Sequence, residues 1–154
     1  MDKMLRVVRD TLDPHYDIDV EPEFQRDVRV RLADSLDVFF SVESGKRLYC
    51  QCDWDTGLAA DDPAVLAALS QACNEHHESC PEGKLAIDGL PGSERETGTG
   101  SVVLSASDLT MCFPRVPDEV IGRAAIRMLS GVYGALRKID DAVGFVYSLP
   151  EARF

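Results

Sequence analysis

The residues best suited to chemistry lie in one short segment, Cys73-Asn74-Glu75-His76-His77-Glu78-Ser79-Cys80. Thiols and imidazoles are the ligands that zinc prefers, and a tetrahedral site takes four of them. Cys73 and His76 have helical spacing, as do His77 and Cys80, so each pair can share one face of a helix. One hypothesis is therefore a small zinc-binding protein or metalloenzyme that uses Cys73, His76, His77 and Cys80.

A second interpretation of the same segment needs no metal and no cofactor. The spacing matches no established pattern of two ligand pairs, and the paired motifs of the zinc deaminases are absent from the sequence. Reduced cysteines such as Cys73 commonly serve as small core hydrophobes. On this interpretation, His76, His77 and Cys80 stand at the frayed end of a helix and the chain has no metal site.

Other catalytic motifs are missing from the sequence. Gly98-Thr99-Gly100 lacks a third glycine and a following lysine, so it does not match a phosphate-binding loop. No Gly-x-Ser-x-Gly nucleophile motif occurs, and His15, His76 and His77 are the only histidines available as a general base. We therefore expect no enzymatic activity and no catalytic residues.

The charge of the chain is strongly acidic and unevenly distributed. Sixteen Lys and Arg against 27 Asp and Glu give a net charge of -11, which would repel nucleic acid. The stretch from Asp53 to Glu96 alone contributes -8 of this charge. Such a block usually forms a solvated surface, but it also suits a third hypothesis, an acidic adaptor or inhibitor that binds a basic partner.

Length and composition predict one domain over residues 1–154. With 154 residues, 45% of them hydrophobic, the chain can bury a substantial core without a disulfide or metal. No run of about 20 apolar residues is present, so we expect no membrane insertion. The first residues lack the pattern of a secretory signal and the five cysteines are odd in number, which predicts a cytoplasmic protein with reduced thiols.

Periodicity predicts an α+β fold with a mainly antiparallel sheet of five to six strands and three helices. The stretch 13–27 is expected to be a loop with room for one short strand, and 139–154 a short C-terminal tail. Asp61-Asp62-Pro63 is a helix start, since an acid caps free amides and proline suits the first turn. The expected order is a helix over 1–12, strands within 28–32, 36–42 and 48–54, a helix from Pro63 to about Asn74, strands over 84–89 and 101–113, and a helix from Asp118 to Ile139.

Two details of this pattern concern close packing and exposed surface. Gly131 and Gly134 each cost about 1 kcal/mol relative to alanine inside a helix, so we expect another element to approach that face closely. Phe39 and Tyr49 alternate with Phe40 and Cys50, so both faces of the strand meander carry large side chains. Each face needs cover, and the surplus apolar surface favours a binding protein over an enzyme.

With these features the chain resembles the class I type III secretion chaperones, the Tir-chaperone family of Gram-negative bacteria. The resemblance spans about Met1 to Ile139 and rests on small size, acidic balance and the order of helices and strands. Locally it rests on Asp61-Asp62-Pro63 before the second helix and on Leu109-Thr110-Met111-Cys112-Phe113-Pro114 before the last helix. None of these features is a catalytic signature.

The resemblance implies a cytoplasmic bacterial homodimer that binds the N-terminal region of secreted effector proteins in an extended form. Such a chaperone holds apolar anchors of its client in surface grooves, often adds a client strand to its sheet, and presents the client to the secretion-associated ATPase. By position, the resemblance implies a client groove at Leu5, Val8, Leu12, Val30 and Phe39, and a dimer interface at Leu66, Leu69, Leu85 and Ile87. The segments 13–27 and 90–100 are longer than the family pattern.

Overall fold

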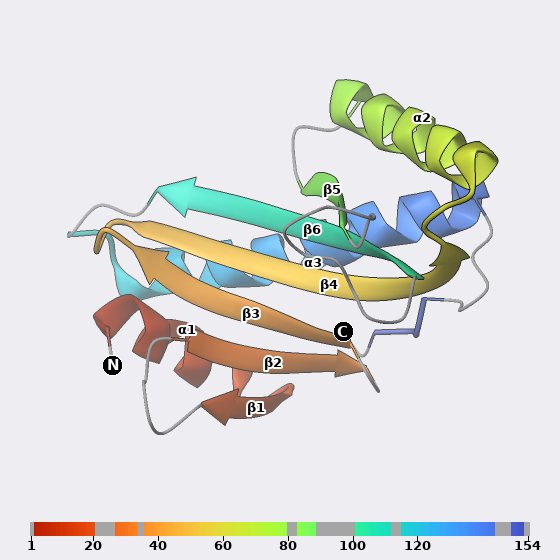
Figure 1. The fold of residues 1–154 in the computed structure, drawn as a ribbon. Helices are drawn as coiled ribbons and strands as arrows, with labels where there is room; N and C mark the ends of the chain where they lie inside the picture. The colour runs from red at the N-terminus through yellow and green to blue at the C-terminus, as the bar shows by residue number, and fades with distance from the viewer. Residues whose placement is uncertain are drawn as a thin grey trace.

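The computed structural model describes residues 2–20, 27–33, 36–79, 83–88, 101–111, 115–143 and 149–152. It is an α+β fold in which one sheet has the strand order β1-β2-β3-β4-β6-β5, with every neighbouring pair antiparallel (Figure 1). The elements are α1 (Lys3–Leu12), β1 (Asp17–Val20), β2 (Asp27–Ala33), β3 (Leu36–Glu43), β4 (Arg47–Ala59), α2 (Pro63–Ser79), β5 (Lys84–Asp88), β6 (Ser101–Met111) and α3 (Asp118–Val143).

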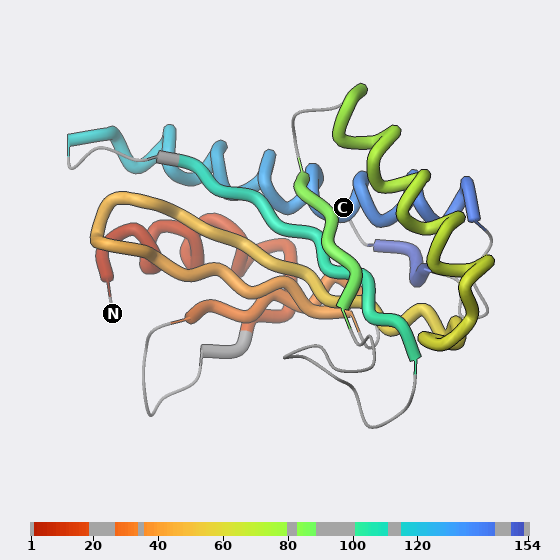
Figure 2. The backbone as a smooth tube through the Cα atoms, turned by 45° about the horizontal axis from the view of Figure 1, so that its top comes forward, coloured from red at the N-terminus to blue at the C-terminus, as the bar shows by residue number. Residues whose placement is uncertain are grey.

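The helices divide the sheet into two unlike faces. Helices α1 and α3 pack side by side on one face, which we call the inner face, while α2 lies against α3 and beside β5 (Figure 2). We call the opposite face of the sheet the outer face. The predicted fold class is confirmed, and the sixth strand is β1, which lies within the stretch expected to be a loop with room for one strand.

Alternation along the strands decides which side chains form the core. Successive side chains of a strand point to opposite faces, so Leu36, Val38 and Phe40 of β3 are buried under the helices while Phe39 is exposed. The same alternation fills the inner face from β2, β4 and β6. The core therefore lies between the sheet and the layer of α1 and α3.

Helix α1 forms for reasons that the sequence makes plain. The Asp2 carboxylate accepts a hydrogen bond from the Met4 amide at 2.7 Å and so caps the free end of the helix. The four apolar residues of its stripe are all buried against the sheet and α3. At Gly122 the two helices touch, since a Cβ there would lie 2.7 Å from the Thr11 hydroxyl oxygen.

The predicted close approach to α3 exists at one of the two glycines. Gly83, with a φ of +72°, lies so near Gly131 that a Cβ on Gly83 would be 3.0 Å from the Gly131 carbonyl oxygen. Gly134 has nothing within 4 Å of its Cβ position, so the expectation is wrong there. The approach comes from the residue that leads into β5, not from a helix.

Two predicted boundaries need correction. Helix α2 continues to Ser79, beyond the expected end near Asn74, because Cys73 and His76 are buried and keep its last turns in place. Helix α3 continues to Val143, so the tail predicted from residue 139 begins too early. Beyond it, Leu149 is buried, and the Tyr133 hydroxyl donates to the Pro150 carbonyl at 2.9 Å. Among the helices of the described ranges, none combines the length and the apolar character needed to cross a membrane.

Candidate protein-interaction surface

Four of the five residues expected to line a client groove belong to the core. Leu5, Val8 and Leu12 are 2%, 0% and 1% exposed, because the single apolar stripe of α1 packs onto the sheet and α3. Val30 is fully buried on the inner face of β2. These four residues therefore do not line an open groove, and this part of the predicted site is corrected. Phe39, at 41% exposure, is the one that remains on the surface.

The residues expected to form a dimer interface divide in the same way. Leu69 is fully buried and Leu85 is 8% exposed, because α2 packs against α3 and β5 and these side chains fill that contact. Both belong to the core and are corrected as interface residues. Leu66 and Ile87 are only partly buried, so they alone of the four retain accessible surface.

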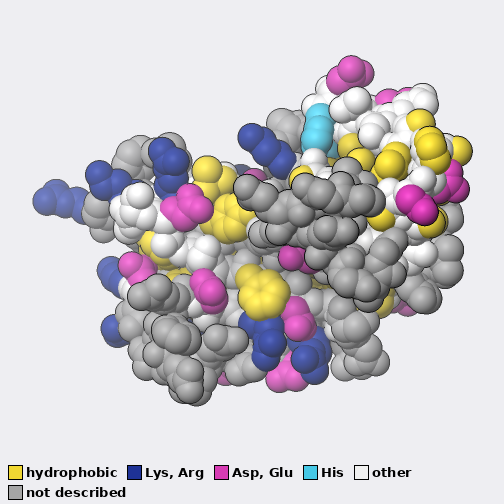
Figure 3. Space-filling view, in the orientation of Figure 1, with side chains coloured by type: hydrophobic (Ala, Val, Ile, Leu, Met, Phe, Trp, Pro, Cys, Tyr) yellow, Lys and Arg dark blue, Asp and Glu magenta, His cyan; other side chains and the backbone are white. Residues whose placement is uncertain are grey.

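A short apolar row crosses the outer face at its centre. Tyr49 of β4 lies directly opposite Leu109 of β6, and Phe39 of β3 lies opposite Gln51, two residues along β4 from Tyr49. Phe39 and Leu109 are 41% and 46% exposed, and Tyr49 is half-buried between them. Figure 3, which views this face, shows hydrophobic side chains gathered over the central strands. We call Phe39, Tyr49 and Leu109 the outer row.

Polar side chains flank the outer row. The Tyr49 hydroxyl donates to the Gln51 side-chain oxygen at 2.6 Å, and the Gln51 amide nitrogen donates to Asp53 at 2.9 Å. On the other side of Phe39, the Arg31 guanidinium lies 3.3 Å from the Asp37 carboxylate. An apolar row with a polar rim is the usual anatomy of a protein-binding surface.

A depression lies at one end of the outer row, next to the start of β5. Tyr49 and Leu109 form part of its wall, and charged residues of both signs also line it. Its lining residues are Glu43, Tyr49, Lys84, Ser107, Asp108 and Leu109. Leu109, Ser107 and Asp108 were missed as site residues by the sequence reasoning, although the alternation within 101–113 already put Leu109 on the face opposite the core.

The two histidines of the zinc hypothesis bind backbone groups. The His76 Nε2 donates to the Gly83 carbonyl at 2.9 Å, and the His77 Nε2 accepts from the Leu85 amide at 2.9 Å. Together these two hydrogen bonds connect the last turns of α2 to the start of β5. Within the described part of the chain, no group of three or more His, Cys, Asp or Glu could hold a metal ion. Cys80 lies outside the described residues.

The described cysteines are buried thiols. Burial, together with the nearby Asp108 carboxylate, raises the pKa of the Cys50 thiol to about 12. Burial also raises the pKa values of Cys52 and Cys73. A raised pKa keeps a thiol protonated and poorly nucleophilic, so these three side chains suit a core and not a catalytic role.

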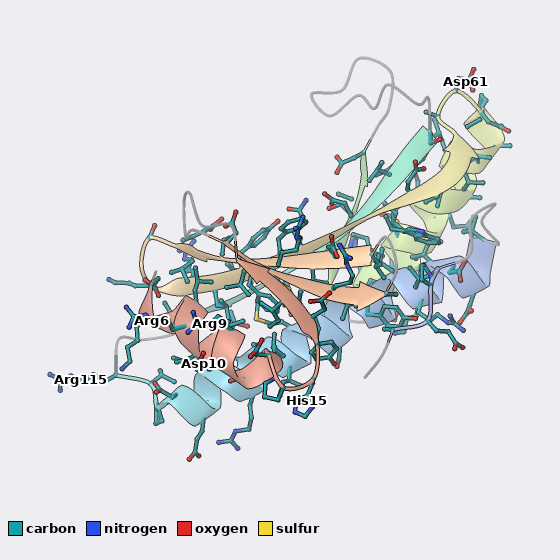
Figure 4. The ribbon with its side chains drawn as sticks, turned by 90° about the horizontal axis from the view of Figure 1, so that it is seen from below. Arg6, Arg9, Asp10, His15, Asp61 and Arg115 are labelled. Atoms are coloured by element: carbon teal, nitrogen blue, oxygen red, sulfur yellow. The ribbon has the colours of Figure 1, made fainter. Side chains whose placement is uncertain are left out.

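Exposed charges are spread over the molecule. Arg6 and Arg9 on α1 lie at the same end as Arg115, while Asp61 stands at the opposite end, beyond β4 (Figure 4). Arg9 pairs with its neighbour Asp10 at 3.0 Å. The labelled groups thus do not converge on one point, as acid, base and nucleophile would have to do in an active site.

Comparisons with known proteins establish the fold alone. No family model matches the chain, and the search of curated proteins finds no match. The solved structure of YbjN from E. coli, a proposed transcription regulator, is similar with a TM-score of 0.66 and 11% identity over 95% of both chains. An uncharacterised protein from Methanothermobacter thermautotrophicus is similar with a TM-score of 0.53 and 9% identity, covering 92% of this chain and 99% of that one.

Proposed function

We propose that this chain is a polypeptide-binding protein of the secretion-chaperone type, which acts in the bacterial cytoplasm without catalysing a reaction. The observation that carries the proposal is the outer row, where two large apolar side chains are more than 40% exposed on a strand surface that no described helix covers. Exposed apolar rows with polar rims are typical of surfaces that bind other proteins. Its client would be a secreted effector, bound through its N-terminal region and handed to the secretion-associated ATPase.

The remaining features fit a binding role. The described thiols are buried and have raised pKa values, and His76 and His77 are engaged with backbone groups. Each of these two histidines binds the backbone through one ring nitrogen, and the described residues hold no group of three or more His, Cys, Asp or Glu that could bind a metal ion, which disfavours the zinc alternative. A homodimer remains part of the proposal, with Leu66 and Ile87 as the accessible residues of the implied interface.

A role in transcription, which the description of YbjN raises, is disfavoured as direct contact with DNA. A net charge of -11 repels the phosphate backbone, which supplies most of the affinity of DNA-binding proteins. A regulatory role of this chain would act through a protein partner, and would then use the same kind of surface.

The test is native mass spectrometry of the chain isolated gently from its own cells, because one spectrum reports oligomer, metal and bound polypeptide together. We expect the wild type to carry a second, different chain. The double variant Phe39→Ser with Leu109→Ser should lose it, since both exposed apolar anchors of the outer row are gone.

A matched control is available on the opposite layer of the molecule. Val120 and Ile126 of α3 are 43% and 46% exposed, so Val120→Ser with Ile126→Ser removes similar apolar surface elsewhere. This control should keep the bound chain. A partner that survives in the outer-row variant but not in the control would refute the proposal, as would stoichiometric zinc with no bound polypeptide.

A further inference from the structure

A short segment beyond α3 in the sequence packs back against that helix. Residues 149–152, which we call the strap, belong to no helix or strand, and five residues of the sequence separate them from the end of α3 at Val143. Figure 2 draws the strap in dark blue beside the C-terminal half of α3. The strap therefore contacts α3 on the helix side of the sheet, whereas the outer row lies on the opposite face.

One tyrosine hydroxyl of α3 binds two main-chain groups of the strap. The Tyr133 hydroxyl donates to the Pro150 carbonyl at 2.9 Å and accepts from the Ala152 N–H at 3.2 Å. In an extended chain, the C=O of one residue and the N–H of the residue two positions later point the same way, so one hydroxyl can bind both. Tyr133 therefore recognises the course of the main chain and not a particular side chain.

The side chains of the strap divide between the core and the solvent. Leu149 is 3% exposed and belongs to the core, and Ala152 is half-buried against it, whereas Glu151 is exposed. The proline between Leu149 and Glu151 has no N–H that would need a partner, and its fixed φ suits an extended course. The pattern is an apolar residue, a proline, a solvent-facing residue and a small residue that keeps its N–H.

The strap is held in the way that a short peptide ligand is held. A buried apolar side chain beside main-chain hydrogen bonds is typical of sites that bind extended peptides. The strap has one large buried side chain and takes part in no helix or strand, and segments held by few contacts open at a low cost in free energy. When the strap leaves, the space that Leu149 fills and the Tyr133 hydroxyl become accessible.

We propose that the surface of α3 around Tyr133 is a peptide-binding site, which the chain fills with its own strap and which an extended segment of a different polypeptide takes over. The incoming segment repeats the pattern from Leu149 to Ala152. It buries its apolar side chain where Leu149 lies, and its main chain offers a carbonyl and an N–H to the Tyr133 hydroxyl. This site is additional to the outer row and goes beyond the proposed function.

The strap sets the affinity that an incoming segment must exceed. A short tether holds a ligand at an effective concentration on the order of 1 mM, so the competing segment needs tighter contacts or a second point of attachment. A second copy of this chain gains nothing by exchanging straps, because the exchange forms only the bonds that each closed chain already has and costs association entropy. We therefore assign the incoming segment to a different polypeptide.

The probe is a fluorescein-labelled peptide with the sequence of residues 148–152 between glycines, and fluorescence anisotropy measures its binding to the whole chain. In the double variant Leu149→Ser with Ala152→Pro, the strap has lost its buried side chain and its N–H, so the site is open. We expect this variant to bind the peptide about tenfold more tightly than the wild type, whose site is filled. A peptide with the same two substitutions should not bind the double variant.

Tyr133→Phe tests the hydroxyl itself. Added to the double variant, it should weaken binding of the peptide by about tenfold, because two hydrogen bonds to the main chain of the peptide are lost. Tyr49→Phe is the matched control, since it removes a half-buried hydroxyl of the outer row that donates to Gln51, and it should leave binding unchanged. Weaker binding after Tyr49→Phe but not after Tyr133→Phe would place the peptide on the outer row and overturn the inference.

Ala152→Pro alone covers the case in which the double variant does not fold. It keeps Leu149 and removes the N–H, so its affinity for the peptide should lie between those of the wild type and the double variant. A folded variant that binds the peptide no more tightly than the wild type would overturn the inference. This holds whether the peptide binds neither protein or binds both equally, since the strap then covers no peptide site.

Three results separate this inference from the proposed function. If the peptide does not bind a folded double variant while Phe39→Ser with Leu109→Ser still loses the native partner, the site at Tyr133 is wrong and the outer row stands. If the peptide binds as expected while that outer-row variant keeps its partner, the reverse holds. If sedimentation shows a wild-type dimer that Leu149→Ser with Ala152→Pro dissociates, the straps are exchanged between copies and the assignment to a different polypeptide is wrong.

Discussion

Phe39 and Phe40 are consecutive residues of β3 with opposite surroundings. Phe40 is fully buried on the inner face under the helices, whereas Phe39 is 41% exposed on the outer face. The same contrast holds for Cys50 against Tyr49 on β4. One face of the sheet therefore supplies stability, and the other is available for recognition, although both carry large side chains.

The largest expected effect comes from truncating Phe40, and the same change at Phe39 is its matched control. Phe40→Ala removes a fully buried ring and leaves a cavity, so we expect it to lower the free energy of unfolding by about 3–5 kcal/mol. Phe39→Ala removes a ring already in contact with water, and we expect a loss below about 1 kcal/mol. Urea unfolding measures both, and equal losses would show that the outer face is covered in solution.

Sequence patterns predicted the fold well because alternation and capping act locally. The period of two in β2, β3 and β4, the stripe of α1 and the Asp62 cap of α2 all appear where they were expected. The Asp62 carboxylate accepts from the Ala64 amide at 3.0 Å, next to Pro63 in the first turn. These features depend on neighbours in the sequence, so no tertiary information is needed to find them.

The site was predicted less well because a hydrophobic pattern does not say what covers it. The stripe of Leu5, Val8 and Leu12 looks the same in sequence whether it faces a client or the sheet, and in the structure it faces the sheet and α3. Phe39 comes from the same resemblance as this stripe, and it is exposed in the structure because its neighbour Phe40 takes the core position. The depression beside the start of β5 depends on where β5 ends relative to β6, and that register is a tertiary property.

A smaller effect is expected at Gly83, the residue that precedes β5 and lies close to α3. Its φ of +72° disfavours a side chain, and a Cβ would lie 3.0 Å from the Gly131 carbonyl oxygen. Gly83→Ala should therefore lower the free energy of unfolding by about 1–3 kcal/mol.

Gly134 provides the matched control for this prediction. It lies inside α3 with nothing within 4 Å of its Cβ position, so Gly134→Ala should raise stability by up to about 1 kcal/mol through helix propensity. Thermal unfolding of the two variants distinguishes the cases. If Gly83→Ala is as stable as wild type, the contact with α3 does not constrain the start of β5.

The variant with the smallest expected effect on stability compares how accessible a thiol is on each of the two faces of the sheet. Ser41→Cys puts a thiol on the outer face beside the outer row, opposite Tyr49, and should leave stability almost unchanged. At pH 8.5 this thiol should react with iodoacetamide within minutes, while Cys50 should not react until urea unfolds the protein. With a pKa of about 12 against an ordinary 9.0, folded Cys50 has about a thousandfold less thiolate.

The raised pKa of Cys50 also makes the stability of the protein depend on pH. Folding holds the proton on Cys50 more tightly than the unfolded chain does, so this contribution to stability is complete below pH 9 and is lost as the pH rises toward 12. Cys50→Ala should therefore unfold with a shallower loss of stability over that range than the wild type. If Cys50 instead reacts as fast as the thiol introduced by Ser41→Cys while the protein is folded, the inner face opens to solvent and the contrast between the faces is one of degree.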